Sequence, residues 1–219
     1  MRTVVFDLDG TLADTSGDLL AAANVCFREM GHGDQLGPGD AGTAFHGARA
    51  MLRLGLSRVD VKDEAVVDAW YPRLLAAYGA ALDRETFLYP GVVEAVEALR
   101  AAGYRTAICT NKPEGLAVEL VRRLRIAHLF GALIGADTLP VRKPDAAPYM
   151  LAVERVGGDV RRSMLVGDTD TDRQTGHAAG VPVVLVTFGP EGRAVERLAP
   201  EALMDSYADL SAIAARLLG

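Results

Sequence analysis

Two aspartates separated by one residue follow a short apolar run at the amino terminus. Asp7 and Asp9 come directly after Val4-Val5-Phe6. Residues i and i+2 of an extended chain face the same way, so both carboxylates can address one bound group. Such a pair can supply a nucleophile, a general acid–base or ligands for a hard divalent cation. Solvated acids at a strand end are the alternative, and the continuation Gly10-Thr11 favours the functional interpretation.

Further polar residues follow later apolar runs. Thr110-Asn111-Lys112 ends the run at 107–110, Asp168 and Asp172 follow the run at 164–167, and Lys143 precedes a proline. Lysine occurs only at 62, 112 and 143, whereas the other basic residues among the 23 are arginine. In an arginine-rich chain, a lysine can mark a place that needs a compact ammonium group.

Alternating apolar and helical patterns predict the elements that position these residues. Helical patterns separate short, buried-type strands over most of the chain. Strands are predicted at residues 4–8, 107–110, 133–136, 164–167 and 183–187, and helices at 91–102, 113–124, 146–156 and 171–179. This alternation predicts an α/β fold with a doubly wound parallel sheet, whose ligands bind beyond the carboxyl ends of the strands.

Residues 14–87 interrupt the alternation, because they contain no convincing strand pattern. Helical patterns occur there at 18–30, 43–53 and 64–82, with a glycine-rich loop at 31–42. We therefore predict a catalytic core formed by residues 1–13 and 88–219, and a small helical domain inserted at 14–87 after the first strand.

Composition limits the classes of partner. The 219-residue chain has a net charge of −6, which argues against binding nucleic acid but permits a small phosphorylated metabolite. We expect no signal peptide, no transmembrane segment and no membrane partner. Cys26 and Cys109 lie in apolar runs and are expected to be buried thiols, which suits the cytoplasm. A monomer and a homodimer are both compatible with the sequence.

Four segments, in order along nearly the whole chain, resemble the motifs of the haloacid dehalogenase-like superfamily. The match lies in the combination, since each motif alone would be weak. The segments are Asp7-Leu8-Asp9-Gly10-Thr11-Leu12, Thr110-Asn111-Lys112, Lys143-Pro144 and Gly167-Asp168-Thr169-Asp170-Thr171-Asp172.

The resemblance implies a Mg²⁺-dependent phosphatase with an α/β core and a small helical cap. Asp7 would attack phosphorus and form an aspartyl-phosphate, while Asp9 would act as the general acid and base. The Asp7 carboxylate, the Asp9 backbone carbonyl and Asp168 would hold Mg²⁺, which prefers oxygen ligands. Asp172 would hold Lys143 or a metal-bound water.

The resemblance also implies which residues bind the phosphoryl group. Thr110 and the backbone N–H of Asn111 would donate hydrogen bonds to its oxygens, and Lys143 would stabilise the charge on Asp7 and on the transferring group. Lys112 is either part of the site or a solvated lysine at the start of a helix, and the sequence leaves both possibilities open.

Substrate choice is expected to lie in the cap. Residues 45–52, like Thr110-Asn111-Lys112, resemble the phosphoglycolate phosphatase group. Arg49 could bind a substrate carboxylate, although an ordinary exposed helical arginine is the alternative, and His46 is a weaker candidate. The predicted reaction is hydrolysis of 2-phosphoglycolate to glycolate and phosphate.

Other functions within and outside the superfamily compete with this prediction. A haloacid dehalogenase would need neither Asp9 nor magnesium. A phosphosugar mutase would share the motifs but usually continues Gly-Val where this chain has Gly10-Thr11. A phosphosugar phosphatase and a pyrophosphatase stay open, while a non-enzymatic phosphate-binding module would be expected to lack the nucleophile.

Overall fold

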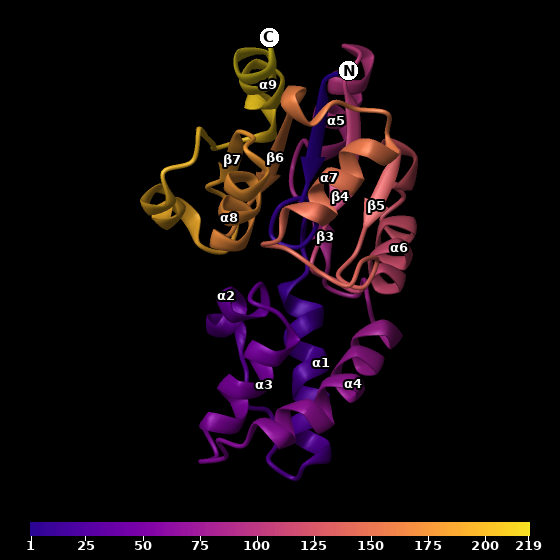
Figure 1. Ribbon diagram of the computed structural model, residues 1–219. Coiled ribbons are helices and arrows are strands. Elements are labelled where there is room, and N and C mark those ends of the chain that lie inside the picture. The colour runs from indigo at the N-terminus through magenta and orange to yellow at the C-terminus, as the bar shows by residue number, and fades with distance from the viewer. The chain divides into compact units, whose positions relative to one another are not determined.

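The computed structural model describes residues 1–219 and divides them into two compact units (Figure 1). One unit comprises Met1–Ala13 and Leu88–Gly219, and the other comprises Asp14–Phe87. The short strands β2 (Ala13–Asp14) and β3 (Phe87–Leu88) flank the inserted segment and pair with each other.

The first unit is built on a six-stranded parallel sheet with the order β5-β4-β1-β6-β7-β8. Val5 on β1 lies in register with Ala107 on one neighbouring strand and Leu165 on the other. The predicted fold class is therefore confirmed. The strands are β1 (Thr3–Phe6), β4 (Arg105–Cys109), β5 (Ala132–Ile134), β6 (Ser163–Gly167), β7 (Val183–Val186) and β8 (Ala202–Met204).

The chain winds outward from the centre of the sheet in two directions. From β1 it proceeds to β4 and β5, and it then returns to β6 on the other side of β1 before continuing to β7 and β8. The direction therefore reverses beside β1, which is where open α/β sheets form their ligand crevice.

Helices cover both faces of this sheet. The helices α5 and α9 pack on one face and contact each other, while α7 and α8 pack on the opposite face (Figure 1). The helices of this unit are α5 (Val92–Ala101), α6 (Glu114–Arg123), α7 (Ala146–Arg155), α8 (Asp170–Ala179) and α9 (Leu210–Leu218). Short 3-10 helices span Ala127–Leu129, Val160–Arg162, Gly192–Leu198 and Tyr207–Asp209.

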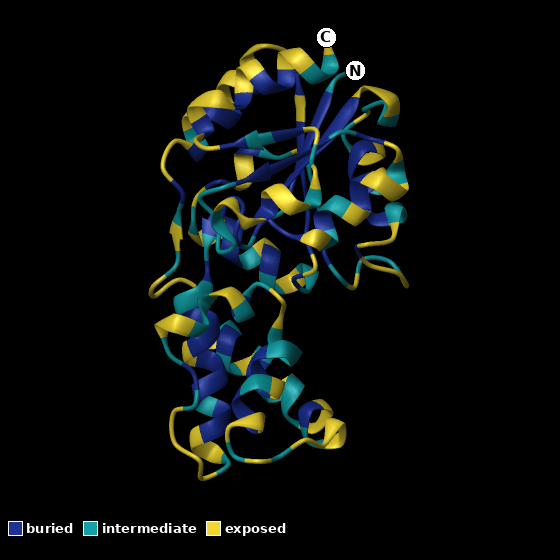
Figure 2. Cartoon of the chain, turned by 90° about the vertical axis from the view of Figure 1, so that its left-hand side faces the viewer, coloured by how far each residue is buried: buried dark blue, intermediate teal, exposed yellow.

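The core of the first unit lies between the sheet and these helices. Every residue of β1 and β6 is buried, as expected for parallel strands covered on both faces (Figure 2). Tyr149 and Val153 of α7 pack against Val5 and Leu165 of the sheet. Cys26 and Cys109 are free and buried, as predicted, and no helix is long and apolar enough to cross a membrane.

The second unit is helical and contains α1 (Ser16–Glu29), α2 (Ala41–Ala44), α3 (Ala48–Ser57) and α4 (Glu64–Ala80), with a 3-10 helix at Pro38–Asp40. Helix α1 packs against both α3 and α4. Gly55 permits the approach of α3 to α1, because a Cβ at Gly55 would lie 2.1 Å from Cζ of Phe27. Asn24 secures the loop after α1 by donating to the Leu36 carbonyl oxygen at 2.8 Å.

Two local predictions were wrong, and two elements were not predicted. The predicted helix at 43–53 is two helices, because the chain turns at Gly47, whose φ of 92° favours glycine. The first strand ends at Phe6 rather than residue 8, since the Leu8 carbonyl accepts hydrogen bonds from the backbone of Leu12 and Ala13 at 3.0 and 3.1 Å. Strand β8 and helix α9 were not predicted.

Candidate active site

The loop after β1 holds the first two aspartates at the carboxyl edge of the sheet. The backbone N–H of Asp7 still donates to the Val166 carbonyl at 2.9 Å, which fixes Asp7 to the neighbouring strand. The chain then turns at Gly10, which has a φ of 78°. The Tyr207 hydroxyl donates to the Thr11 carbonyl at 2.8 Å and so supports the loop from a distant part of the sequence.

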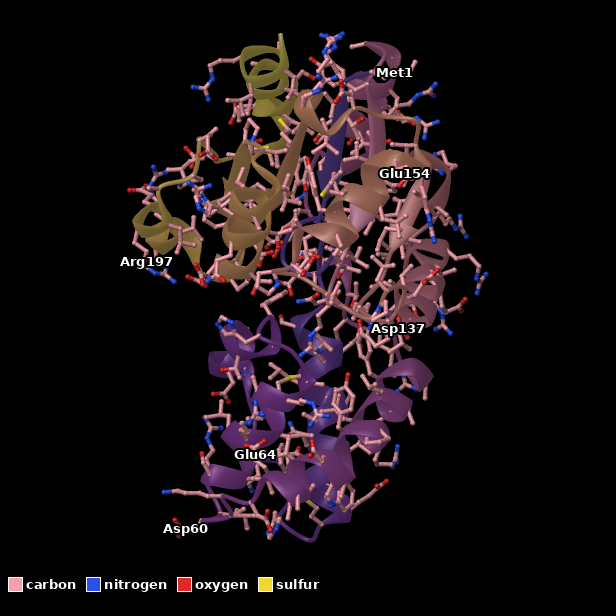
Figure 3. The ribbon with its side chains drawn as sticks, in the orientation of Figure 1. Met1, Asp60, Glu64, Asp137, Glu154 and Arg197 are labelled. Atoms are coloured by element: carbon pink, nitrogen blue, oxygen red, sulfur yellow. The ribbon has the colours of Figure 1, made fainter.

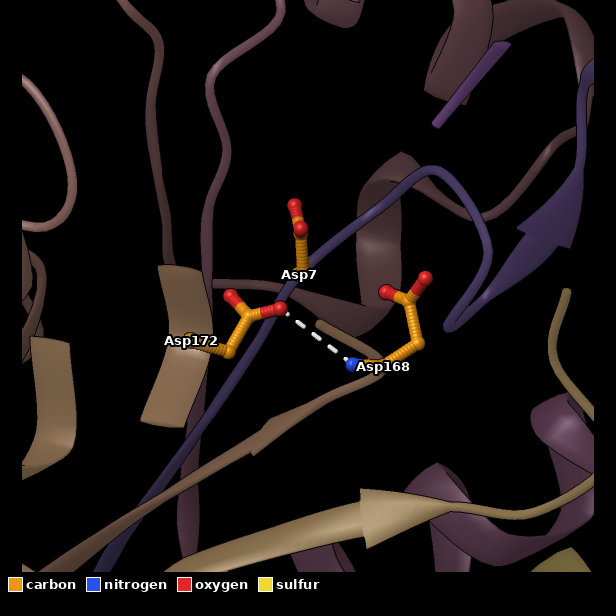
Figure 4. A group of neighbouring side chains, drawn as sticks. All are labelled: Asp7, Asp168 and Asp172. Carbon is orange, nitrogen blue, oxygen red and sulfur yellow. Dashed lines mark hydrogen bonds between the residues drawn. The ribbon is translucent and has the colours of Figure 1, made fainter. Parts of the chain in front are cut away.

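Three buried carboxylates converge at this edge. Asp7 follows β1, Asp168 follows β6 and Asp172 lies in the first turn of α8 (Figure 4). One carboxylate oxygen from each lies within 4.8 Å of the others. Three acids so close together repel one another strongly in a buried site, so they require cations to compensate them.

Asp172 is fully occupied by donors from the protein. Its Oδ2 accepts from the backbone N–H groups of Asp168 and Thr169, at 3.2 and 3.1 Å, and from the Thr169 hydroxyl at 2.8 Å. Its Oδ1 accepts from Nζ of Lys143 at 2.6 Å. A side chain on Gly167 would collide with this carboxylate, since a Cβ there would lie 2.3 Å from its Cγ. Asp172 therefore acts as a fixed anchor for Lys143.

Asp168 differs from Asp172 because one of its oxygens has no partner. Its Oδ1 accepts from the Thr11 hydroxyl at 2.8 Å, but its buried Oδ2 makes no hydrogen bond. Burial, and then the charges of Asp172 and Asp7, raise the pKa of Asp168 well above its usual value. A bound cation would give Oδ2 a partner and offset the cost of holding a buried, ionised carboxylate among other acids. The donor set therefore fits a hard metal ion such as Mg²⁺.

Replacing Asp168 with asparagine is expected to stabilise the protein when no metal is present. The raised pKa means that ionising Asp168 costs stability as the pH rises above the carboxyl's ordinary range, and the neutral amide removes that cost. In EDTA at pH 8, Tm should rise by about 2–4 °C, the shift produced by ~1 kcal/mol in a chain of this size. Thermal unfolding followed by circular dichroism measures the effect.

The exposed acid Asp170, in the same turn of α8, offers a matched control. Asp170→Asn should leave Tm in EDTA nearly unchanged. Added Mg²⁺ should raise the Tm of the wild type and of Asp170→Asn, but not that of Asp168→Asn. A lower Tm for Asp168→Asn in EDTA would contradict an electrostatic cost at this position.

Lys143 supplies the positive charge inside the acid cluster. Its side chain is only 1% exposed, and its Nζ lies 3.0 Å from Oδ2 of Asp7 and 2.6 Å from Oδ1 of Asp172. Burial alone would lower the pKa of Lys143, but the two carboxylates outweigh burial and raise it above its usual value. The side chain is therefore a permanent cation at neutral pH.

The environment of Asp7 combines opposing effects. The pKa of Asp7 is raised to about 6. Burial is the largest cause, Asp172 and Asp9 also raise the pKa, and Lys143 lowers it. The backbone N–H of Leu8 donates to Oδ1 of Asp7 at 2.7 Å. Above pH 6 the side chain is thus an oriented carboxylate, which is the form required of a nucleophile.

A second ion pair lies on the other acid of the first loop. Nζ of Lys112 is 2.6 Å from Oδ1 of Asp9, and the Lys112 side chain is 3% exposed. The alternative that Lys112 is a solvated lysine is therefore wrong. Thr110 Oγ1 accepts from the backbone N–H of Lys112 at 3.2 Å, and the Asn111 amide donates to the Lys143 carbonyl at 3.0 Å. These contacts link three of the four motifs.

Arg49 belongs to the helical unit and is already engaged there. Its guanidinium forms an ion pair with Asp68 and lies 4.4 Å from the centre of the Tyr71 ring. Its side chain is 38% exposed. The contact with Asp68 uses Nη1, so a substrate carboxylate would either share the guanidinium with Asp68 or displace it.

Sequence reasoning gave no role to two residues that shape the site. Thr11 holds Asp168, and Tyr207 supports the Thr11 carbonyl. Thr11 lies within the first motif, so its position was a usable signal. No sequence pattern connects Tyr207 with a residue so far along the chain, but the structure packs its ring against Phe188, with 5.4 Å between ring centres.

Fold and site together define an α/β protein with buried carboxylates around a lysine at the point where the winding of the sheet reverses. Residues 4–186 match the family of haloacid dehalogenase-like hydrolases. The chain therefore belongs to this family, and the resemblance seen in its motifs is confirmed.

Several individual proteins are similar to this chain over most of their length. The chain is 37% identical to a phosphoglycolate phosphatase of Agrobacterium fabrum, over 94% of this chain and 89% of that protein. It is 34% identical to a phosphoglycolate phosphatase of Cereibacter sphaeroides, and the match covers 100% of both chains. A crystal structure of a predicted phosphoglycolate phosphatase from Haemophilus somnus superposes with a TM-score of 0.85 at 27% identity, covering 97% of each chain.

Proposed function

We propose that this chain is a Mg²⁺-dependent phosphoric monoester hydrolase that converts 2-phosphoglycolate to glycolate and phosphate. The buried cluster in which Lys143 contacts Asp7, and in which Asp168 presents an oxygen without a partner, carries the proposed chemistry. The names of the relatives support the choice of substrate.

In the proposed reaction, Asp7, Asp168 and the backbone carbonyl of Asp9 hold the metal ion. Mg²⁺ supplies positive charge that lets a carboxylate approach a phosphate dianion. Lys143 lies 3.0 Å from Asp7 and would stabilise the negative charge that gathers on the transferring group. Thr110 and the backbone N–H of Asn111 would donate to the phosphoryl oxygens.

The chemistry would proceed in two steps on this chain's own residues. An Asp7 oxygen attacks phosphorus, the bond from phosphorus to the glycolate oxygen breaks, and Asp9, which enters this step as the carboxylic acid, gives that oxygen a proton. A water molecule then attacks the aspartyl-phosphate and gives a proton to Asp9. This attack releases phosphate and restores the Asp7 carboxylate. The Lys112 ammonium, 2.6 Å from Asp9, would fix the orientation of the Asp9 carboxyl group during both transfers.

A panel of phosphate compounds tests the substrate. With Mg²⁺ present, kcat/KM should be greatest for 2-phosphoglycolate and lower for a hexose phosphate, for pyrophosphate and for p-nitrophenyl phosphate. Preference for a hexose phosphate or pyrophosphate would overturn the substrate assignment and leave the phosphatase assignment standing. Conversion of one hexose phosphate isomer to another would instead identify a mutase.

Arg49→Ala is expected to reduce kcat/KM for 2-phosphoglycolate by about one to two decades. We propose that the helical unit selects the substrate and that the Arg49 guanidinium binds the carboxylate through paired, charge-assisted hydrogen bonds. The variant should hardly change kcat/KM for p-nitrophenyl phosphate, which has no carboxylate. Steady-state kinetics on the two substrates measure the difference.

Arg53 provides the control for Arg49. It lies on the same helix, is exposed, and forms a comparable ion pair, with its Nε 2.7 Å from Glu64. Arg53→Ala should leave kcat/KM almost unchanged for both 2-phosphoglycolate and p-nitrophenyl phosphate. Equal losses on both substrates in Arg49→Ala would show that the contacts with Asp68 and Tyr71 are the main role of Arg49.

A small phosphorylated metabolite is thus the proposed partner of the site. A cytoplasmic location and a monomeric or homodimeric state stay predictions from the sequence.

A further inference from the structure

A hollow lies in the first unit, at the amino edge of the sheet. It has a volume of about 460 Å³ and is bordered by Arg105 and Thr106, which begin β4, and by Gly131, which precedes β5. The catalytic residues follow the carboxyl ends of the strands. Because β4 has five residues, the hollow lies roughly 15 Å from that edge.

The two edges can be followed in Figure 3. Glu154, next to Arg155 at the end of α7, marks the region of the hollow, and Asp137, beyond the carboxyl end of β5, marks the opposite edge. The hollow is therefore separate from the site described above.

The lining of the hollow is basic and contains no carboxylate. Arg100, Arg105, Arg155 and His128 border it, together with Tyr104 and Phe130. None of these three arginines forms an ion pair, although many other arginines of the chain, such as Arg73 and Arg161, do. In a chain with 29 acidic and 23 basic residues, three guanidinium groups without a carboxylate partner around one concave surface are a local reversal of charge, although Nε of Arg105 donates to Sδ of Met1 at 3.1 Å.

Helix polarity explains only part of this arrangement. Arg100 and Arg155 lie in the last turns of α5 and α7, where a positive charge is favourable. Arg105 has no such reason to be there, because it begins a strand. Arg216 lies in the last turn of α9 but does not border the hollow. It is therefore a control that distinguishes an effect of helix polarity from an effect of the hollow.

The walls of the hollow are held in place. The Arg100 guanidinium donates to the His128 carbonyl, which fixes one charged group. Tyr104 is buried beneath Arg2, whose guanidinium carbon is 4.2 Å from the centre of the ring. Phe130 packs edge-on against Phe6 with ring centres 5.9 Å apart. A held wall lowers the entropy that binding would otherwise cost.

We infer that this hollow is a binding site for a small organic polyanion that carries phosphate groups. Guanidinium groups match phosphate oxygens through paired hydrogen bonds, and three of them suit a ligand with two or three anionic groups. The volume lies in the range of small-molecule sites, and a concave surface of this size favours a compact ligand over an extended polymer. The site is independent of the proposed catalytic function.

Binding of tripolyphosphate to the full chain, measured by isothermal titration calorimetry in EDTA, tests the inference. Removing divalent metal withdraws the charge that would draw the probe to the acidic catalytic edge. We expect one equivalent to bind at moderate ionic strength. Arg105→Gln and Arg155→Gln should each weaken binding about tenfold or more, because each removes a charge-assisted contact.

Arg216→Gln should bind tripolyphosphate like the wild type. Absence of saturable binding by the wild type would overturn the inference, and so would unchanged affinity in the Arg105→Gln and Arg155→Gln variants. Equal weakening by Arg216→Gln would show diffuse attraction rather than a site. The three arginines are exposed, and a matching Tm for each variant verifies that the fold is intact.

Discussion

Asp7→Asn is expected to reduce turnover by about 10⁴-fold or more, the scale of loss seen when a nucleophile is removed from a cooperating site. The side chain keeps its shape, and its oxygen can still accept the hydrogen bond from the backbone of Leu8. The neutral amide is, however, too weak a nucleophile to attack phosphorus. Kinetics with 2-phosphoglycolate and p-nitrophenyl phosphate measure the loss, and circular dichroism verifies the fold.

Asp9→Asn provides a useful contrast. The variant would lose the proposed proton donor but keep the proposed nucleophile, so turnover should fall by about 10²–10⁴-fold, the usual contribution of general acid–base catalysis. The loss should be smaller with a leaving group that needs little protonation, such as p-nitrophenolate. Turnover close to wild type in carefully purified Asp7→Asn would refute covalent catalysis by Asp7.

Removal of divalent metal is expected to abolish activity, and Mg²⁺ is expected to restore it. Asp7, Asp168 and Asp172 present oxygens within 4.8 Å of one another, and Lys143 contacts two of these acids, Asp7 and Asp172. Without further positive charge, a phosphate dianion would be repelled from a site that already carries an excess of negative charge. Activity should be measured after EDTA treatment and again after dialysis into Mg²⁺.

Thermal unfolding gives a second measurement of the same event. Mg²⁺ should raise Tm, and the rise should grow with the Mg²⁺ concentration, because the ion binds the folded chain and not the unfolded one. Replacement of Mg²⁺ with K⁺ at equal ionic strength controls for general screening. Full activity in EDTA would refute the magnesium assignment and favour the metal-independent chemistry of a dehalogenase.

Local sequence patterns determined the central elements of the fold. Apolar runs of four or five residues predicted β1, β4, β6 and β7, since strands buried on both faces need apolar side chains throughout. Strand β8 and helix α9 were not predicted, because three apolar residues or one short helical pattern can occur by chance in a chain that is 50% apolar. The break at Gly47 was missed because residues 43–53 were interpreted as a single helical pattern. Only the structure shows the φ of 92° that ends the helix there.

The four motifs predicted which residues would carry the proposed chemistry, but not how each one is paired. The sequence pointed to Asp7, Asp168 and Lys143 because their spacing and context are unusual. Tertiary structure decided that both oxygens of Asp172 are occupied by protein donors while Oδ2 of Asp168 is left without one. It also decided that Lys112 is buried against Asp9.

The physical reason is the distance along the chain between partners. A strand or a helix is encoded by residues within a few positions of one another, so its pattern can be read locally. Hydrogen-bond partners such as Thr11 and Asp168, or Thr11 and Tyr207, are 157 and 196 residues apart and meet only when the sheet and its helices pack. The sequence therefore indicated the central elements and the candidate reactive groups, and the packing of the sheet decided their partners, their burial and their charge.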